Sequence, residues 1–273
     1  MSTNTCRAGA GAALLAALGL AMSPAASADS DAELAKKAQN PIAAMISLPL
    51  QLNHDEGYGA TGDGEKWLLN VQPVIPFDLG SDWNLISRTI VPLIDQEDFV
   101  AGGALDESGV GDVLQSQFFS PKAPTAGGWI WGVGPALLLP TASDKVLGSE
   151  KWALGPTAVV LKQENGWTVG VLGNHLWSVA GEDDRDDISA TFVQPFLGYT
   201  TRTYTTFMIN TESTYDWKRE TWSVPVNLMV TQMLRVGGQP LTLQAGARYW
   251  ADSPDGGPDG WGFRFAVTFL FPK

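Results

Sequence analysis

Four charged residues lie within segments where apolar and polar residues alternate, and they are the strongest candidates for binding a solute. They are Arg88, Glu212, Arg248 and Arg264. Arg248 and Arg264 stand in the last two of these segments, and two neighbouring arginines can bind an anion or a carboxylate through paired hydrogen bonds. Ionisable groups that face the lumen of a membrane barrel tend to set its selectivity. We therefore expect these residues, with Asp112, to line or gate a solute path. A neutralised structural network is the open alternative.

His175 is the strongest candidate for an enzyme site, because lipid-acting enzymes can carry a Ser-His pair on the surface of a barrel. Alternation places His175 on an outward face near a loop. Ser178 lies three residues further on, on the opposite face, and the neighbours expected beside His175 are near Gly155 and Val193. A nucleophile needs its base within hydrogen-bond reach. We therefore predict no catalytic residue and no enzyme, with a lipid-acting enzyme as the alternative.

Metal and cofactor motifs are weak in this chain. The acidic segments 182–187 and 252–259 offer oxygen ligands without ordered spacing, as solvated turns do. His54 begins another acidic stretch and is expected to be a surface residue. Residues 57–62 (GYGATG) match the letters of a dinucleotide motif, but a strand follows where a helix is required. The sequence predicts no metal site and no cofactor.

Period-2 alternation and turn signals predict about twelve strands of about 10 to 12 residues. Globular strands average about 5 or 6 residues, whereas a tilted strand that crosses a membrane needs about 9–11. The lengths favour an all-β, transmembrane, antiparallel up-and-down β-barrel. The predicted strands are 45–53, 66–77, 83–93, 110–120, 128–139, 152–163, 167–179, 189–199, 203–215, 222–233, 240–250 and 261–271.

Aromatic residues bracket the apolar faces of several strands at one spacing. Ten residues cover about 33 Å along a strand, or about 25 Å along the membrane normal at a tilt near 40°, which is the height of a lipid-facing band. In the last strand, aromatic residues also fill most alternate positions between the two ends. The pairs at this spacing are predicted to form two aromatic girdles: Trp67 with Phe77, Trp167 with Trp177, and Trp261 with Phe271.

Connections alternate between tight turns and longer acidic loops, which is the arrangement of outer-membrane barrels with turns and termini in the periplasm. The loops 54–65, 94–109, 140–151, 180–188, 216–221 and 251–260 hold 21 of the 29 Asp and Glu residues.

Hairpin pairing predicts polar pairs inside, and we expect Arg88 opposite Gln72, Asn210 opposite Asn227 and Arg248 near the level of Arg264. It also predicts outward pairs of Val193 with Ile209 and of Pro195 with Phe207.

Two features fit a regular barrel less simply. Proline removes a ladder donor, and six prolines fall inside predicted strands: Pro49, Pro73, Pro135, Pro156, Pro195 and Pro225. Residues 31–39 predict a short helix, with Ser30 and Glu33 as a capping box and Pro41 beyond its end. Three placements of this helix are open: it plugs the lumen, lies below it, or belongs to a plain periplasmic tail.

The N-terminus predicts export. Residues 1–28 have a basic residue, Arg7, an apolar stretch and an Ala-Ser-Ala cleavage site, as a secretory signal peptide does. Cleavage before Asp29 removes Cys6, the one cysteine, so that the mature chain has no disulfide. It changes the net charge from -12 to 16 minus 29, or -13. Nucleic acid is therefore not expected as a partner.

Five segments resemble a bacterial family. They are 34–41 (LAKKAQNP), 71–77 (VQPVIPF), 82–90 (DWNLISRTI), 210–219 (NTESTYDWKR) and 247–254 (ARYWADSP). The chain is similar to outer-membrane barrel transporters filed as putative proteins of the meta-pathway of phenol degradation, some of them mislabelled neuromedin U. The resemblance implies an outer-membrane channel for small, including aromatic, compounds, and it implies no catalytic residues.

Together these observations predict a signal peptide (1–28), a periplasmic segment with a short helix (29–44) and an outer-membrane barrel (45–273) in a Gram-negative bacterium. Passive passage of small solutes is the expected function; a lipid-acting enzyme, a soluble secreted β-domain and a non-conducting structural barrel are the alternatives. The expected partners are membrane lipid, a small-molecule solute and the outer-membrane assembly machinery. The sequence does not define an oligomeric state.

Overall fold

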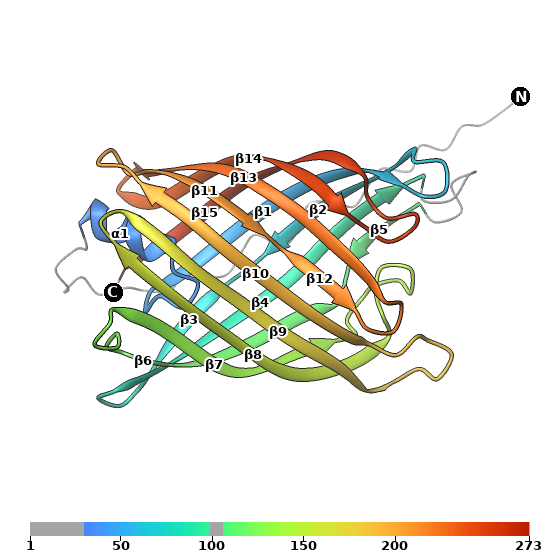
Figure 1. Cartoon of the computed structure of the whole chain (residues 1–273), viewed down its shortest axis with the longest axis horizontal. Helices are drawn as coiled ribbons and strands as arrows, with labels where there is room; N and C mark the ends of the chain where they lie inside the picture. Colours follow the sequence, from blue (N-terminus) through green and yellow to red (C-terminus); the bar gives the residue numbers. More distant parts are fainter. Residues whose placement is uncertain (1–29, 99–105, 273) are drawn as a thin grey trace, which may run out of the picture.

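The computed structural model describes residues 30–98 and 106–272. The expected signal peptide, residues 1–28, and Asp29 lie outside these ranges, as does Lys273. None of the helices in the described ranges has the length and apolar character needed to cross a membrane. The described chain forms a closed antiparallel β-barrel with a short helix at one end (Figure 1).

Twelve passes of the chain build the barrel in the described ranges, as predicted. Three passes are interrupted, and β1 pairs with β15 to close the wall. The strands are β1 (Ile46–Tyr58), β2 (Gly64–Val71), β3 (Val74–Leu79), β4 (Trp83–Glu97), β5 (Glu107–Val110), β6 (Val113–Pro121), β7 (Trp129–Leu139), β8 (Lys151–Glu164), β9 (Trp167–Gly181), β10 (Ser189–Thr200), β11 (Thr205–Thr211), β12 (Ser213–Asp216), β13 (Thr221–Val236), β14 (Gln239–Asp252) and β15 (Gly260–Phe271).

The two ends of the barrel differ in their connections. The turn end carries the segments 80–82, 122–128, 165–166, 201–204 and 237–238, and the loop end carries 59–63, 140–150, 182–188, 217–220, 253–259 and the connection from β4 to β5. The expected loops 54–65 and 94–109 begin too early, because β1 and β4 continue to Tyr58 and Glu97. Polar side chains occupy these strand ends, and polarity alone made them look like loops.

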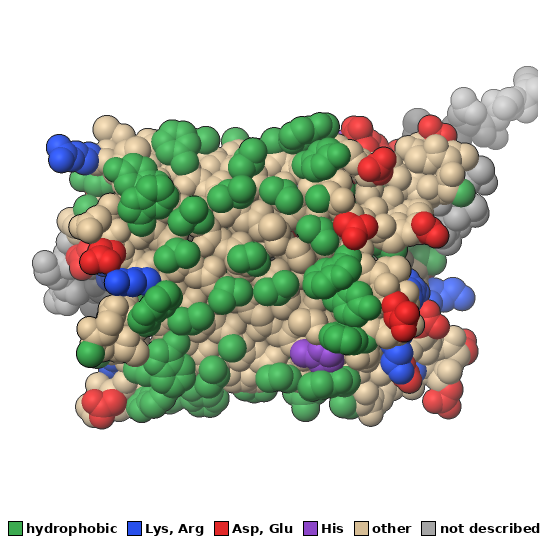
Figure 2. Space-filling model, viewed as in Figure 1, with side chains coloured by type: hydrophobic (Ala, Val, Ile, Leu, Met, Phe, Trp, Pro, Cys, Tyr) green, Lys and Arg blue, Asp and Glu red, His purple; other side chains and the backbone are tan. Residues whose placement is uncertain are grey.

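The outer surface of the barrel is apolar, as the alternation predicts. Phe263 and Phe265 are exposed while the intervening Arg264 is buried. Hydrophobic side chains cover the middle of the visible face, and charged side chains gather at both ends (Figure 2). Exposed aromatic residues form two belts: Phe77, Trp83, Trp129, Trp167, Tyr199 and Phe207 toward the turn end, and Trp67, Trp152, Trp177, Trp217, Trp222 and Trp261 toward the loop end. Phe271 lies at the turn end and is half-buried.

Strand register agrees with some predicted pairs and contradicts others. Asn210 pairs with Asn227, as expected. Arg88 pairs with Val74, two residues from the expected Gln72, although the two side chains still meet. The predicted outward pairs around residues 200–202 are wrong, because the turn is longer: Ile209 pairs with Leu197 and Phe207 with Tyr199.

Most mid-strand prolines coincide with interrupted pairing. Pro73 follows the end of β2, and Pro225 stands at a bulge between β13 and β14 and opposite the gap between β11 and β12. Pro135 and Pro156 pair with each other, where neither can donate a ladder bond. The broken ladders therefore accommodate the prolines that a regular strand would exclude.

The N-terminal helix α1 (Asp31–Ala38) packs against the barrel wall at the turn end. It begins at Ser30, whose side chain accepts a hydrogen bond from the backbone N–H of Glu33, as the capping prediction requires. Leu34 and Ala35 are buried against Met45, Met233 and Leu270. The helix is therefore packed into the turn end of the lumen and is not a free periplasmic tail, and we call residues 30–42 the plug.

Candidate functional site: a charged lumen beside an apolar wall

Glu212 owes its position to an interrupted strand. It lies between β11 and β12, and its backbone N–H donates to the Pro225 carbonyl (3.4 Å). Pro225 has no N–H to return, and Pro195 lies at the same gap in β10. The break in the ladder directs the Glu212 side chain into the lumen.

Arg264 and Glu212 form the centre of the lumen site. The Arg264 guanidinium donates from Nη1 to Glu212 Oε1 (2.8 Å) and from Nη2 to Oε2 (2.7 Å). Its Nε donates to Asn53 Oδ1 (2.7 Å), which fixes the plane of the fork. Paired hydrogen bonds of this kind are strong and directional. Since Arg264 is only 3% exposed, this contact is needed to offset the desolvation of its charge.

Arg248 joins the same carboxylate from the neighbouring strand. Its Nη1 lies 3.3 Å from Glu212 Oε2, and its Nε lies 3.0 Å from Asp55 Oδ1. The Trp250 indole donates to Asp55 (2.9 Å), and the Arg248 guanidinium stacks over the Trp250 ring (4.7 Å). We call Asn53, Asp55, Glu212, Arg248 and Arg264 the polar wall. Two carboxylates and two guanidinium groups balance within it.

Arg88 differs from the other lumen arginines in its partner. It donates to the neutral Gln72 amide (2.7 Å), and none of the described carboxylates forms an ion pair with it. It borders a cavity of about 190 Å³, lined also by Gln51, Gln72, Asn210, Gln244 and Thr242 and by the apolar Phe196 and Met208. Arg88 therefore brings a positive charge that no direct ion pair neutralises to a cavity rich in amides.

The opposite side of the lumen is hydrophobic. Ile86, Phe118, Val159, Leu161, Leu172 and Phe196, which we call the apolar wall, form one buried cluster. Ile42, from the segment that follows α1, inserts into this cluster. The lumen thus has a charged side and an apolar side, and the segment after α1 packs into the apolar side.

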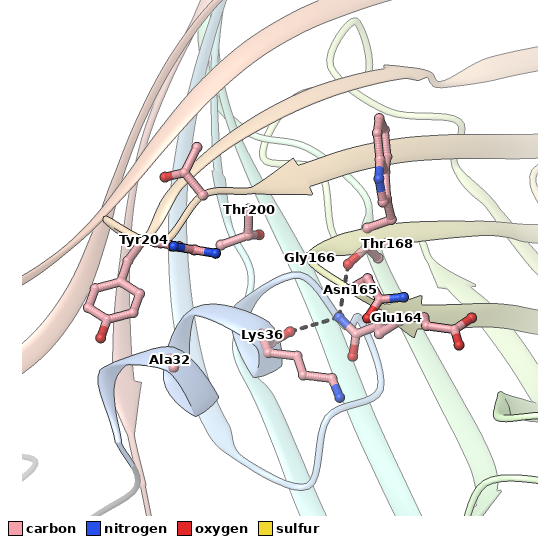
Figure 3. Close-up of a pocket in the computed structure, with 12 residues that line it drawn as sticks. Ala32, Lys36, Glu164, Asn165, Gly166, Thr168, Thr200 and Tyr204 are labelled. Atoms are coloured by element: carbon pink, nitrogen blue, oxygen red, sulfur yellow. Dashed lines mark hydrogen bonds between the residues drawn. The ribbon is translucent and has the colours of Figure 1, made fainter.

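A second cavity opens beside α1 at the turn end. It measures about 400 Å³ and lies between Lys36 on the helix and the turns at Asn165, Gly166 and Tyr204 (Figure 3). Gln163 donates to the Lys36 carbonyl (2.9 Å) and to Thr168 (3.1 Å), and so ties the helix to the barrel rim. The plug leaves free space on this side.

The structure brings most of the predicted lumen residues together. Glu212, Arg248 and Arg264 are in direct contact. Asp112 lies elsewhere: its carboxylate accepts hydrogen bonds from Ser149 (2.6 Å) and from the Ala142 N–H (3.2 Å) and orders the loop 140–150. Sequence reasoning missed Asp55, because the expected strand stopped at residue 53, and it did not single out Asn53 or Trp250.

The two histidines both lie on the outward face. His175 Nδ1 lies 2.7 Å from Thr191 Oγ1, which also accepts from the Trp217 indole (2.8 Å). Thr191 stands in register where Val193 was expected. His54 was expected to be a surface residue, but it is only 6% exposed.

The fold and this lumen define the class as a β-barrel of the outer-membrane type, with an apolar outside and a charged inside. No protein-family model matches the sequence, and no curated protein matches it either. Among solved structures, the chain is similar to an outer membrane channel from Pseudomonas putida F1, with a TM-score of 0.64 and 16% identity over 84% of this chain and 96% of that one.

More distant barrels are also similar. The β domain of the Bordetella autotransporter BrkA has a TM-score of 0.48 at 10% identity, over 84% of this chain and 100% of that one. The outer membrane phospholipase A of Escherichia coli has a TM-score of 0.47 at 12% identity, over 89% and 97%. At these TM-scores neither likeness bears on the chain's function.

Proposed function

We propose that the protein is a channel of the bacterial outer membrane that passes small solutes through its lumen. The observation that carries this proposal is the two-sided lumen, with the polar wall on one side, the apolar wall on the other and a cavity at Arg88 that Phe196 of the apolar wall also lines. The apolar outer band and its aromatic belts favour a membrane position, with the loop end outside and the turn end in the periplasm. The fold likeness to a channel agrees with it.

The cavity at Arg88 favours small organic anions with an apolar body. Gln72 is a neutral partner, so a solute carboxylate can pair with the Arg88 guanidinium. Phe196 and Met208 offer apolar contact on the other side of the cavity. Aromatic carboxylates fit both features and fall within the aromatic compounds that the family resemblance implies.

Single-channel conductance of the folded mature protein in a planar bilayer tests the proposal. We expect discrete steps under a salt gradient, and a reversal potential that shifts toward cation preference in Arg88→Gln and in the Arg248→Ala, Arg264→Ala double variant. Benzoate should block the parent channel more than the Arg88→Gln channel. Arg219→Gln, in an exposed loop, is the matched control.

Two results would contradict this proposal. Protein verified as folded that gives no discrete steps would not be an open channel, and it would favour a structural barrel. If the parent, Arg88→Gln and the Arg248→Ala, Arg264→Ala double variant all give discrete steps with the same reversal potential, the protein is a channel whose selectivity does not depend on the lumen arginines.

The geometry supports a lipid-acting enzyme less well. The hydroxyl that reaches His175 belongs to Thr191 and is also hydrogen-bonded to Trp217. No carboxylate of the described residues is within ion-pair distance of His175 to orient its ring as a general base. We expect no lipid hydrolysis by the folded protein; hydrolysis that is lost in His175→Ala would establish the alternative.

A further inference from the structure

His54 is buried on the outer surface of the barrel, close to the loop end. Its ring packs between Trp67 and Phe263, with ring centroids 4.2 and 5.1 Å away. These two residues are its register partners in β2 and β15. The two aromatic rings therefore hold the imidazole in one orientation.

Two carboxylates converge on this imidazole. Glu56 lies two residues further along β1 and so on the same face, and Glu65 is paired with Glu56 across β2. His54 Nε2 is 3.1 Å from Glu65 Oε2, and Nδ1 is 3.8 Å from Glu56 Oε1. One ligand atom from each residue lies within 4.8 Å of the others.

The carboxylates continue across a third strand. Glu65 pairs with Glu97 of β4 as well as with Glu56, so three glutamates stand in one row across the outward face. Like charges directly opposite each other in a sheet are destabilising. Lys66, in the middle of this region, belongs to the lumen face and pairs with Asp55 in register. Among the described residues, no lysine or arginine forms an ion pair with the row.

We propose that His54, Glu56 and Glu65 form a binding site for a divalent metal ion of the zinc type. One imidazole nitrogen and two carboxylate oxygens are a ligand set that suits such ions. A buried, clamped histidine fixes one ligand, and the ion neutralises the glutamate row. The fourth ligand position faces the medium and accepts water.

The distances allow the site to close. Tetrahedral zinc bonds of about 2.0–2.1 Å place ligand atoms about 3.4 Å apart. The side chains of Glu56 and Glu65 are 65% and 41% exposed, so they can move from their present distances to this spacing. The His54 side chain is 8% exposed and is held in place. With two ligands at i and i+2 and the third across the ladder, all three side chains lie on one patch of the outward face. One ring nitrogen of His54 binds the ion, and the glutamate that faces the other nitrogen turns toward it.

Metal titration of the folded, detergent-solubilised protein tests the site. The protein should carry no histidine tag and should first be treated with a chelator. We expect calorimetry to show one Zn²⁺ per chain, and Co²⁺ to give a visible absorption band that Zn²⁺ displaces. His54→Gln and Glu65→Gln should each weaken binding by at least about 10-fold, since even outer-shell partners of a metal contribute about 10- to 100-fold.

His175→Gln is the matched control, because it removes the other histidine of the outward face and should bind like the parent. Glu65→Gln changes an exposed side chain and keeps the test valid if His54→Gln fails to fold. The absence of Zn²⁺ binding, or binding that His54→Gln leaves unchanged, would overturn the proposal. Binding of Ca²⁺ with equal strength in parent and His54→Gln would instead assign a hard cation to the glutamate row. The channel proposal is independent, since these residues lie outside the lumen.

Discussion

The polar wall and the apolar wall of the lumen arise from the same strand geometry but differ in what their side chains require. In both walls, the strands place every second side chain inside the barrel. On the apolar wall, Ile86, Phe118 and Leu161 are almost fully buried and need only to fill space. On the polar wall, Arg264 is equally buried but must find partners of opposite charge at defined distances.

This difference between apolar packing and buried ion pairs indicates which lumen residues can set ion selectivity. Apolar packing is non-directional and tolerates exchange of similar shapes. A buried ion pair is directional, and removal of one partner leaves a charge that the surroundings do not solvate. Changes on the polar wall should therefore alter ion passage and stability together, whereas changes of apolar-wall residues that only fill space, such as Ile86, should alter stability alone.

Removal of the plug should give the largest effect, because α1 and Ile42 pack inside the barrel wall. We expect deletion of residues 30–42 to raise single-channel conductance several-fold, since α1 and Ile42 no longer fill the turn end of the lumen. Arg235→Gln is the control, because it removes the ion pair with Asp31 (2.7 Å) and leaves the plug in the chain. Equal conductance in the deletion variant and the parent would contradict the assigned role of the plug.

Glu212→Gln should disrupt the polar wall. The substitution removes the negative charge that both Arg264 and Arg248 contact. Loss of one partner from a buried ion pair costs about 3–5 kcal/mol, and the two released arginines should also move the reversal potential toward anions. Urea unfolding and bilayer recordings measure the two effects. Glu220→Gln, in an exposed loop, should change neither; a variant that unfolds like the parent would show that the pair contributes little.

Ile86→Val should affect the apolar wall alone. Ile86 is fully buried in the cluster with Phe118, and loss of one methylene there costs about 1 kcal/mol. The reversal potential should stay at the parent value. A shift in selectivity, with packing as the only change, would break the distinction between the two walls.

The smallest effect is expected at the loop end of the apolar side. The Ser178 hydroxyl donates to Asp187 (3.1 Å), and this bond, with the Lys151 ammonium 3.5 Å away, lowers the pKa of Asp187 below its ordinary 3.8. A lowered carboxylate pKa stabilises the fold above the ordinary pKa, and the contribution is lost as the pH falls through the lowered value. The contact should hold at pH 7 and weaken below about pH 4.

Amide hydrogen exchange at Ile188, whose N–H donates to Ser178 (3.1 Å), reports on this loop contact. Asp187→Asn at pH 7 should increase the exchange at Ile188 slightly, and Asp183→Asn should not. Equal exchange at Ile188 in both variants would show that Asp187 does not stabilise this loop contact. The lumen charges should not respond, since the contact lies in the loop 182–188.

Local patterns in the sequence predict the barrel and the facing of its strands. Alternation in the strand from Gly260 to Phe271 separates lipid-facing phenylalanines from lumen-facing Arg264, because successive side chains point to opposite faces. The capping pattern of Ser30 and Glu33 likewise determined a helix, because it depends on residues three positions apart. Both signals are local, because each depends only on the spacing of residues within one segment of the chain.

Which lumen side chains contact one another depends on the tertiary structure. Arg264 contacts Glu212 across 52 positions and Asn53 across 211, and these contacts depend on barrel closure and on strand breaks at prolines. The sequence placed Asp112 with the arginines and His54 on the surface, whereas register puts Asp112 under a loop and His54 between two aromatic rings. Register and closure are properties of the whole sheet, because a ladder shift of two residues keeps every local pattern and still changes every partner.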